Sequence, residues 1–273
     1  MRADDLGFRE RYRPPKRPLT EKYARMHRTF VRDMLDDDGI VARFAESRPL
    51  PRAYGVGLDE RVVEYPWVFS RSPAGRVLDA GSTLNHGHIL DRLLGRIESL
   101  HIVTLAPEPQ AFVERGVSYL FADLRDLPIR DGYYDTVVCV STLDHVGMDT
   151  SPYGVREPKA ADPATEVELA VAELGRVLRP GGRLLVTVPY GRRMDGGWFR
   201  QFDRDDLRAL LAAAGGAEED VSVYAYSRRG WQLSDLDAAA EAEYRDALAD
   251  ATPVVDLAAA ARAVACFAVE RQD

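Results

Sequence analysis

The sequence has little of what several protein classes require. It contains two cysteines, Cys139 and Cys266, which lie far apart in apolar, strand-like stretches, so neither a disulfide framework nor a cysteine-based metal site is expected. No apolar run reaches the roughly 18 residues of a membrane span. The amino terminus is charged from its start, which argues against a signal peptide. We therefore expect a cytoplasmic protein with reduced thiols and no attachment to a membrane.

The chain also lacks an excess of basic residues. It carries 36 Lys and Arg against 44 Asp and Glu, a formal net charge of −8. General affinity for nucleic acid depends on neutralising phosphates with Lys and Arg. Nucleic acid is therefore not an expected partner, although a local basic patch stays open.

The 273 residues suffice for one large α/β domain with an elaborated amino terminus. Residues 1–18 are rich in Arg and Pro and are expected to form a flexible tail. Residues 19–75 are expected to form a helical extension, because Thr20 can cap a helix whose apolar residues recur at spacings of three and four up to about Phe44. Residues 76–273 remain for the main domain.

The segment 55–71, GVGLDERVVEYPWVFSR, mixes charged and aromatic residues with short apolar runs. One interpretation is a helix and loop that pack on the edge of a sheet. The other is a lid that closes over a ligand and excludes water. In either case Trp67 is expected to anchor the segment, and Tyr65 and Trp67 are candidate substrate contacts.

The stretch 76–85, RVLDAGSTLN, organises the rest of the chain. Two apolar residues, then Asp79 and Gly81, and then a helical pattern predict a strand, a tight turn and a helix. Neither the dinucleotide pattern G-x-G-x-x-G nor the phosphate loop G-x-x-x-x-G-K-[ST] is present. An acid at the end of the strand suits a ligand with a cationic amine, while Gly81 leaves room for it.

This stretch resembles the first motif of class I S-adenosylmethionine-dependent methyltransferases, D-x-G-x-G-x-G. Asp79 and Gly81 match it, whereas Thr83 and Asn85 stand where two glycines are usual. The resemblance implies S-adenosylmethionine as the cofactor. It also implies donor contacts from the turn, whose candidate residues are Asp79, Gly81, Ser82, Asn85 and His86.

Three side chains of this turn have a second interpretation. Asn85, His86 and His88 either cap the following helix and fill the space of the missing glycines, or contact the acceptor. Metal ligation by the two histidines together with His145 is a minor alternative, and we expect no metal.

Two further strands extend the resemblance. After the strand 99–105 the family places an acid on the ribose, and Glu108 is the candidate here. After the strand 117–121 the resemblance implies that Asp123 accepts from the adenine amine and that Leu124 follows against the ring.

The apolar run 134–141, which ends at Ser141, suits a strand buried on both faces. The Asp144-His145-Val146 that follows resembles the Glu-His-Val turn of many small-molecule methyltransferases. The resemblance implies that this strand end faces the methyl donor. His145 is the candidate general base, with substrate orientation or a structural role as alternatives, and Asp144 is its candidate partner.

A helix from residue 164 and a fifth strand over 183–189 are expected next. The stretch RVLRPGGRLLVTVP, which joins them, resembles the helix, turn and strand of the family at this point of the chain. Two loops are expected to border the acceptor. Residues 149–163 bring Tyr153, and the aromatic segment 190–202 brings Tyr190 and Trp198.

Together these segments imply a Rossmann-like methyltransferase fold, a doubly wound and mostly parallel seven-stranded sheet with helices on both faces. The last strand, 263–269, is expected antiparallel between the fifth strand and a sixth over 221–226, and the segment 236–261 is expected to be partly helical and broken at Pro253. The implied activity is methyl transfer to a hydroxyl or amine of a small molecule such as a sugar or secondary metabolite.

A non-catalytic nucleotide-binding protein and, less favoured, an NAD(P)-dependent oxidoreductase are the alternatives. The acceptor, the choice between O- and N-transfer, and the presence of a homodimer stay open.

Overall fold

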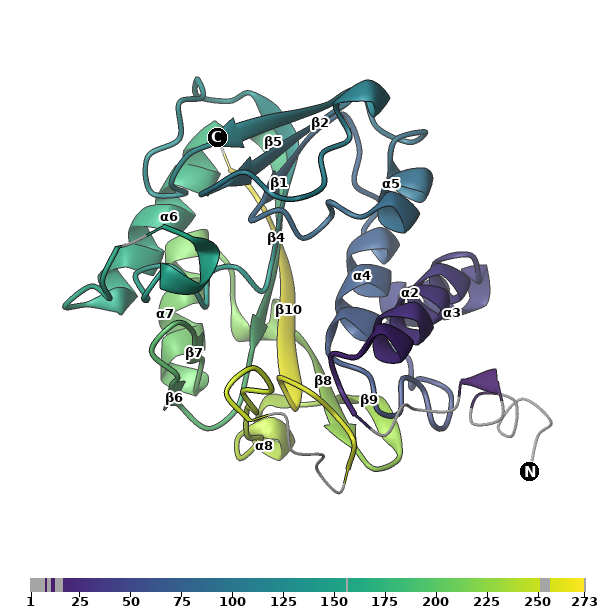
Figure 1. Ribbon diagram of the computed structural model, residues 1–273. Coiled ribbons are helices and arrows are strands. Elements are labelled where there is room, and N and C mark those ends of the chain that lie inside the picture. Colours follow the sequence, from purple (N-terminus) through teal and green to yellow (C-terminus); the bar gives the residue numbers. More distant parts are fainter. Residues whose placement is uncertain (1–7, 9–10, 13–16, 156, 251–255, 273) are drawn as a thin grey trace. The chain divides into compact units, whose positions relative to one another are not determined.

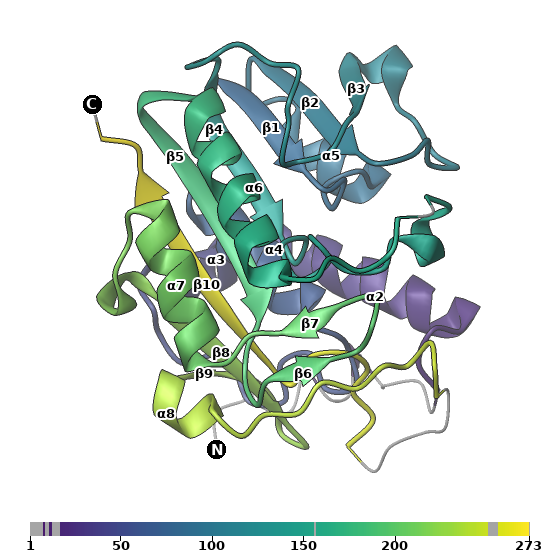
Figure 2. The ribbon, with the colours of Figure 1, turned by 90° about the vertical axis from the view of Figure 1, so that its left-hand side faces the viewer.

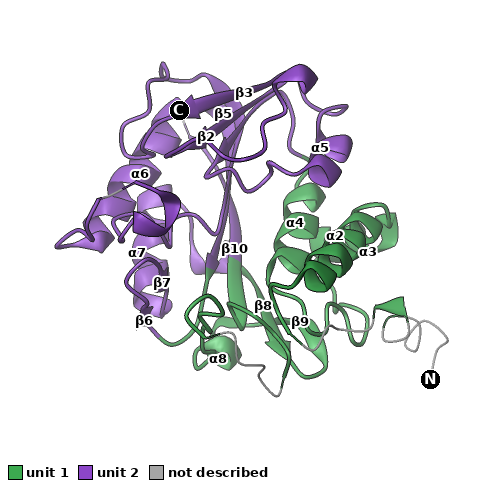
Figure 3. Cartoon of the chain, in the orientation of Figure 1, with its two compact units in different colours: residues 1–72, 189–192, 222–265 green, residues 73–188, 193–221, 266–273 purple. Residues whose placement is uncertain are grey.

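The computed structural model describes residues 8, 11–12, 17–155, 157–250 and 256–272. The chain divides into two compact units, shown in Figure 3. Unit 1 comprises residues 1–72, 189–192 and 222–265, and unit 2 comprises residues 73–188, 193–221 and 266–273. Each unit therefore draws on three separate stretches of the chain.

Unit 2 is built on a mostly parallel sheet (Figures 1 and 2). Its strand order is β3-β2-β1-β4-β5-β10. Strand β1 pairs in parallel with β2 and β4, β2 pairs in parallel with β3, and β4 pairs in parallel with β5. The strands are β1 (Arg76–Ala80), β2 (Ser99–Thr104), β3 (Val117–Phe121), β4 (Tyr134–Val140), β5 (Leu178–Pro189) and β10 (Ala263–Glu270).

The apolar composition of the central strands explains this sheet. Val137, Val138 and Cys139 of β4 are all fully buried, because helices cover both faces. Helices α6 (Pro163–Val177) and α7 (Arg204–Ala214) lie on one face, and α5 (Gly87–Leu93) lies on the other (Figures 1 and 2). The predicted doubly wound fold with helices on both faces is confirmed, and the last strand follows β5 in the sheet as expected.

A small hairpin and three short turns of 3₁₀ helix complete the regular elements among the described residues of unit 2. Strands β6 (Met194–Asp195) and β7 (Arg200–Gln201) pair antiparallel within the aromatic segment after β5. The 3₁₀ turns are η1 (Val113–Arg115), η2 (Ser151–Tyr153) and η3 (Glu218–Asp220).

Unit 1 contains three helices, an antiparallel hairpin and one further short helix among its described residues. The helices are α2 (Glu21–Leu35), α3 (Asp38–Ala45), α4 (Arg61–Ser70) and α8 (Leu236–Ala239). Strands β8 (Ser222–Ser227) and β9 (Gly230–Ser234) form the hairpin, and β10 lies beside β8 in the strand order. Strand β9 is an addition to the seven strands that the sequence predicts.

The predicted long helix of the extension is two helices. Thr20 caps the first as expected, because its hydroxyl accepts from Tyr23 N at 3.2 Å. The chain then breaks at Asp37, whose side chain accepts from the backbone N–H groups of Gly39 and Ile40 and starts α3. A second N-cap inside the predicted helix thus turns the chain.

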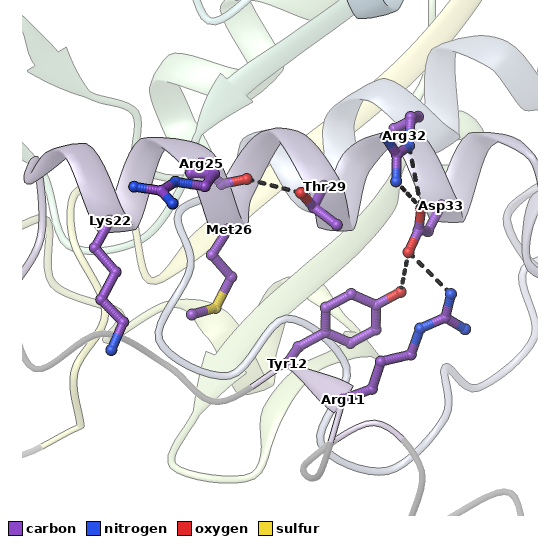
Figure 4. Close-up of a pocket in the computed structure, with 8 residues that line it drawn as sticks. All are labelled: Arg11, Tyr12, Lys22, Arg25, Met26, Thr29, Arg32 and Asp33. Atoms are coloured by element: carbon purple, nitrogen blue, oxygen red, sulfur yellow. Dashed lines mark hydrogen bonds and ion pairs between the residues drawn. The ribbon is translucent and has the colours of Figure 1, made fainter.

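Most of residues 1–18, the expected tail, lies outside the described residues, but Arg11 and Tyr12 are described and contact α2 (Figure 4). The Tyr12 hydroxyl donates to Asp33 Oδ2 at 2.7 Å, and Arg11 Nη2 donates to the same oxygen at 3.1 Å. The Tyr12 ring meets Phe30 edge to face, with centroids 4.7 Å apart. These two residues therefore pack against α2 within unit 1.

Only α8 is helical among the described residues of the segment 236–261, and Pro253, the expected helix breaker, lies outside them. No helix in the part of the chain that the structure describes has the length and apolar character to cross a membrane.

Candidate functional site

The parallel strands of unit 2 end at one edge of the sheet, and most of the predicted site residues follow those ends. Asp79 closes the turn after β1. Its side chain is fully buried, and its two carboxylate oxygens accept hydrogen bonds from Leu84 N at 2.8 Å and Thr83 Oγ1 at 3.2 Å. Burial raises the pKa of Asp79 to about 7, although these hydrogen bonds favour its ionised form. Asp79 therefore titrates near neutral pH.

Gly81 and Ser82 bring the turn close to the end of β4. Gly81 has a φ of +113°, and a Cβ there would lie 2.1 Å from Thr142 Oγ1, so only glycine fits. Ser82 follows with a φ of +64°. Its hydroxyl is buried and makes no hydrogen bond to any residue that the structure describes. Because buried hydroxyls are normally paired, Ser82 Oγ is available to a ligand.

Asn85 ties this turn to two other segments. Its Nδ2 donates to Glu108 Oε2 at 2.9 Å and to the carbonyl oxygen of Gln110 at 3.1 Å. Its Oδ1 accepts from the Tyr119 hydroxyl at 2.8 Å, and that hydroxyl accepts from Phe112 N at 2.8 Å. The Asn85 side chain, in the place of a usual glycine, thus holds Glu108 beside the turn.

His86 and His88 lie at the start of α5. The His86 carbonyl oxygen accepts from Ile89 N at 2.8 Å and from Leu90 N at 2.9 Å, so its backbone begins the helix. The two imidazole rings stack with centroids 5.7 Å apart. Across the described ranges, no three His, Cys, Asp or Glu side chains gather as metal ligands would.

Asp123, at the end of β3, is held by Arg125. Arg125 Nε donates to Asp123 Oδ1 at 2.9 Å, Nη2 donates to Oδ2 at 2.5 Å, and the backbone N–H of Arg125 donates to Oδ1 at 2.8 Å. Burial opposes ionisation of Asp123, but the bonds from Arg125 outweigh it and hold the pKa of Asp123 below its ordinary value. Leu124, the next residue, is buried.

Ser141 ends β4 in a strained conformation. It is buried and has a φ of +36°, which is unusual for a residue with a side chain. Its backbone N–H donates to the carbonyl oxygen and to Oγ1 of Thr187 on β5, at 2.9 and 3.1 Å. Such strain concentrates at functional sites and persists where the surroundings hold it.

Asp144 and His145 form a pair after β4. His145 Nδ1 lies 2.9 Å from the Trp198 carbonyl oxygen. Because a carbonyl oxygen only accepts, Nδ1 carries hydrogen, and Nε2 is the nitrogen that can gain or lose a proton. Nε2 lies 3.3 Å from Asp144 Oδ2, and the side chains are 22% exposed for His145 and 3% for Asp144. A buried carboxylate therefore lies beside the same nitrogen that can carry the exchangeable proton, and the His145 side chain is partly exposed.

Two predicted substrate residues surround His145. The Trp198 ring stacks on the imidazole, with centroids 5.1 Å apart and planes 15° apart. The Tyr153 ring meets the imidazole edge to face at 5.4 Å and is 42% exposed. These flat surfaces can take the apolar or aromatic part of a ligand.

The other three predicted substrate residues belong to unit 1. Tyr65 and Trp67 lie on α4 and are buried. Tyr190 is also buried, and its hydroxyl donates to the Leu236 carbonyl oxygen at 3.0 Å. The burial and contacts of these three side chains are those of unit 1, and their role in binding an acceptor stays a prediction.

Sequence analysis missed three residues of the site: Tyr119, Thr142 and Arg200. Tyr119 lies in a predicted strand, where periodicity assigns a face but no hydrogen-bond partner. Thr142, which follows β4, approaches Gly81 of the turn that follows β1, the neighbouring strand. Arg200 lies in β7, where its backbone N–H donates to the Asp144 carbonyl oxygen at 2.9 Å. No local sequence signal identifies contacts made over such distances along the chain.

Comparisons with known proteins give one family and several similar structures. Residues 78–186 match the family model described as a methyltransferase domain. Comparison with curated proteins found no match.

One similar solved structure is 1,6-didemethyltoxoflavin-N1-methyltransferase from Burkholderia thailandensis, which contains bound 1,6-didemethyltoxoflavin and S-adenosylhomocysteine. The two sequences are 17% identical, the match covers 95% of this chain and 94% of that chain, and the TM-score is 0.44. A second is an S-adenosylmethionine-dependent methyltransferase from Thermotoga maritima, at 16% identity over 89% and 99%, TM-score 0.46. A third is the YcgJ protein from Bacillus subtilis, at 17% identity over 60% and 70%, TM-score 0.42. Scores below 0.5 assign no substrate to this chain.

Proposed function

We propose that this chain transfers a methyl group from S-adenosylmethionine to a hydroxyl or amine of a small-molecule acceptor. The proposal starts from the match of residues 78–186 to a methyltransferase domain. The turn after β1 carries the proposal. There the buried hydroxyl of Ser82, which no described residue pairs, lies beside the buried carboxylate of Asp79.

The donor site fits the residues present. Asp79 offers a carboxylate to a cationic amine, Ser82 Oγ offers a free hydroxyl, and Gly81 keeps the turn clear of a side chain. Glu108, held by Asn85 next to this turn, is the proposed ribose contact, and Asp123 and Leu124 are the proposed adenine contacts. Asn85, His86 and Ser141 are proposed to shape the same site. When bound, S-adenosylmethionine supplies an electrophilic methyl group on its sulfonium.

Asp144 and His145 are proposed to manage the acceptor's proton. His145 Nε2 accepts the proton of the attacking hydroxyl or amine, and the Asp144 carboxylate, 3.3 Å away, stabilises the resulting imidazolium. The bond from Nδ1 to the Trp198 carbonyl oxygen orients the ring for this step. Holding the reactants in line can supply about 7–11 kcal/mol of the rate enhancement, so proton removal is one contribution among several.

The acceptor is proposed to lie against Tyr153 and Trp198, whose rings contact His145. Tyr65, Trp67 and Tyr190 of unit 1 stay predicted acceptor contacts. A sugar or a secondary-metabolite intermediate suits such flat surfaces, and the acceptor class is taken further below.

The first test is calorimetry with S-adenosylmethionine and S-adenosylhomocysteine. We expect both to bind, and Ser82→Ala to weaken binding about two- to tenfold, the effect of one hydrogen bond. Ser118→Ala is the control, because Ser118 is an exposed residue of β3 outside the site. A folded protein that gives no heat with either compound would refute the proposal. Fluorescence titration with NADH then tests the oxidoreductase alternative.

The second test concerns proton transfer. We expect His145→Ala to lower the turnover of an acceptor by about 10²–10⁴-fold, the usual contribution of a general base. Binding of S-adenosylhomocysteine should not change. The measurement is S-adenosylhomocysteine formation with a panel of hydroxylated and aminated small molecules. Ser118→Ala, an exposed residue of β3 outside the site, is again the control. Equal turnover by His145→Ala and the parent protein would remove the base assignment.

A further inference from the structure

Arg200 is a buried cation beside the proposed catalytic pair. It lies in β7 and is 9% exposed. Its backbone N–H donates to the Asp144 carbonyl oxygen at 2.9 Å, and Trp198, two residues earlier, carries the carbonyl that orients His145. The backbone of Arg200 is therefore held at the place where the proposed acceptor reacts.

The guanidinium of Arg200 has no polar partner in the part of the chain that the structure describes. Its Nε is completely buried without a hydrogen bond, and the group forms no ion pair with a described carboxylate. The guanidinium carbon lies 4.4 Å from the centroid of the Phe202 ring. Burying such a group without hydrogen bonds is costly, so a partner is expected.

The nearby acids support the charge of Arg200 without satisfying its hydrogen bonds. Burial lowers the pKa of Arg200, while the charges of Asp206, Asp144 and Asp162 raise it and the charge of Arg193 lowers it further. Asp206 Oδ1 pairs with Arg193 at 3.2 Å, while Asp206 Oδ2 is buried and has no hydrogen-bond partner among the described residues. Asp162 caps α6 by accepting from Ala164 N at 3.1 Å. The guanidinium stays charged, and its buried Nε–H has no acceptor among the described residues.

We infer that the acceptor carries a carboxylate group and that Arg200 binds it. This inference rests on the proposed methyl transfer and names its acceptor class. A guanidinium presents parallel N–H donors in a plane, which matches the two oxygens of a carboxylate. The stacked rings of His145 and Trp198 favour a flat molecule. The acceptor class is therefore an aromatic carboxylic acid with a hydroxyl or amine that His145 can deprotonate.

The test uses the full chain labelled with ¹⁵N and saturated with S-adenosylhomocysteine. The Arg200 Nε–H resonance is assigned by its loss in Arg200→Lys. Benzoate is expected to shift this resonance saturably, whereas benzamide, its neutral analogue, is not. Inorganic phosphate is expected to bind at least tenfold more weakly than benzoate, which separates a planar carboxylate site from a general anion site.

Two variants measured by calorimetry complete the test. Arg200→Met should weaken benzoate binding at least tenfold, whereas Arg193→Met, whose side chain is 65% exposed, should change it less than threefold. Arg200→Met should also leave the melting temperature of the ligand-free protein no lower, because it removes an unpaired buried charge.

Two results overturn the inference and leave the proposed function standing. One is equal benzoate affinity in Arg200→Met and the parent protein. The other is the absence of benzoate binding by protein that binds S-adenosylhomocysteine. A lower melting temperature of Arg200→Met overturns it in favour of a structural pairing with Asp206. Failure to bind S-adenosylhomocysteine refutes both proposals.

Discussion

At the scale of single residues, Asp79 links the stability of the fold to pH. Its pKa is raised by burial from 3.8 to about 7, so the folded protein holds this proton more tightly than the unfolded chain does. The contribution is present in full below pH 4 and is lost as pH rises toward 7, with a slope of up to about 1.4 kcal/mol per pH unit. We expect the free energy of unfolding to fall over this range, as measured by urea denaturation at several pH values.

Asp79→Asn isolates this effect. Asparagine keeps the shape of the side chain but cannot ionise, so the decline between pH 4 and 7 should be smaller in the variant. Burial also raises the pKa of Glu60, but that group is present in both proteins and cancels in the difference. Identical pH profiles for the two proteins would show that Asp79 does not titrate as described.

Gly81 is expected to be the least replaceable glycine of the candidate site. Gly81→Ala places a Cβ 2.1 Å from Thr142 Oγ1 at a φ of +113°, and should cost about 2–4 kcal/mol of stability. Gly116→Ala is the matched control, because Gly116 has a φ of +81° with no atom within 4 Å of the added Cβ, and should cost only about 1 kcal/mol. Urea unfolding measures both, and equal losses would mean that the approach of Thr142 is unimportant.

At the scale of elements, Asp37 separates α2 from α3. Its carboxylate accepts from Gly39 N at 2.9 Å and from Ile40 N at 3.1 Å. Asp37→Ala should therefore lower stability by about 0.5–2 kcal/mol, the usual loss for an N-cap. Asp38→Ala is the control, because Asp38 is the first residue of α3 and its carboxylate contributes only through the helix dipole. If thermal unfolding shows the two variants to be equally stable, the cap does not hold the break.

Elements with one dominant pattern were predictable. The apolar runs of β4 and of residues 183–189 define those strands locally. Pro180-Gly181-Gly182, expected as a turn before the fifth strand, lies inside β5 (Leu178–Pro189). The break at Asp37 was not predictable, because consecutive acids also suit the exposed side of one continuous helix. Strand β9 was missed, since Gly230–Ser234 is short and becomes a strand by pairing with β8, as in Tyr226 with Trp231.

The site was predictable where it follows strand ends and unpredictable where it depends on partners. The resemblance of the Asp144-His145 turn to a family turn, together with its position after a buried parallel strand, predicted this pair. The two side chains lie 3.3 Å apart, and their catalytic role stays a proposal. The bond from Asn85 to Tyr119 joins residues 34 positions apart, and no periodicity encodes it. The lack of an acceptor for the buried Arg200 Nε among the described residues is likewise a result of packing, which no local sequence pattern encodes.

At the scale of the whole molecule, each unit is assembled from separated stretches. The matched region 78–186 lies within unit 2, but that unit also includes residues 193–221 and 266–273, which carry α7 and most of β10. A fragment of residues 73–188 would leave α6 without α7 and β5 without its neighbour β10. We expect this fragment to lack a cooperative urea transition by circular dichroism, whereas the full chain shows one. A cooperative fragment that binds S-adenosylhomocysteine would contradict this expectation.

The hydrogen bonds of Asn85 also constrain how this protein can diverge. A change to glycine at position 85 would remove the acceptor of the Tyr119 hydroxyl and release Glu108 in one step. We expect such a change to be accompanied by changes at those two partners, so the three positions should vary as a set among descendants of this sequence. Motif searches that count glycines would then overlook the lineage that keeps asparagine.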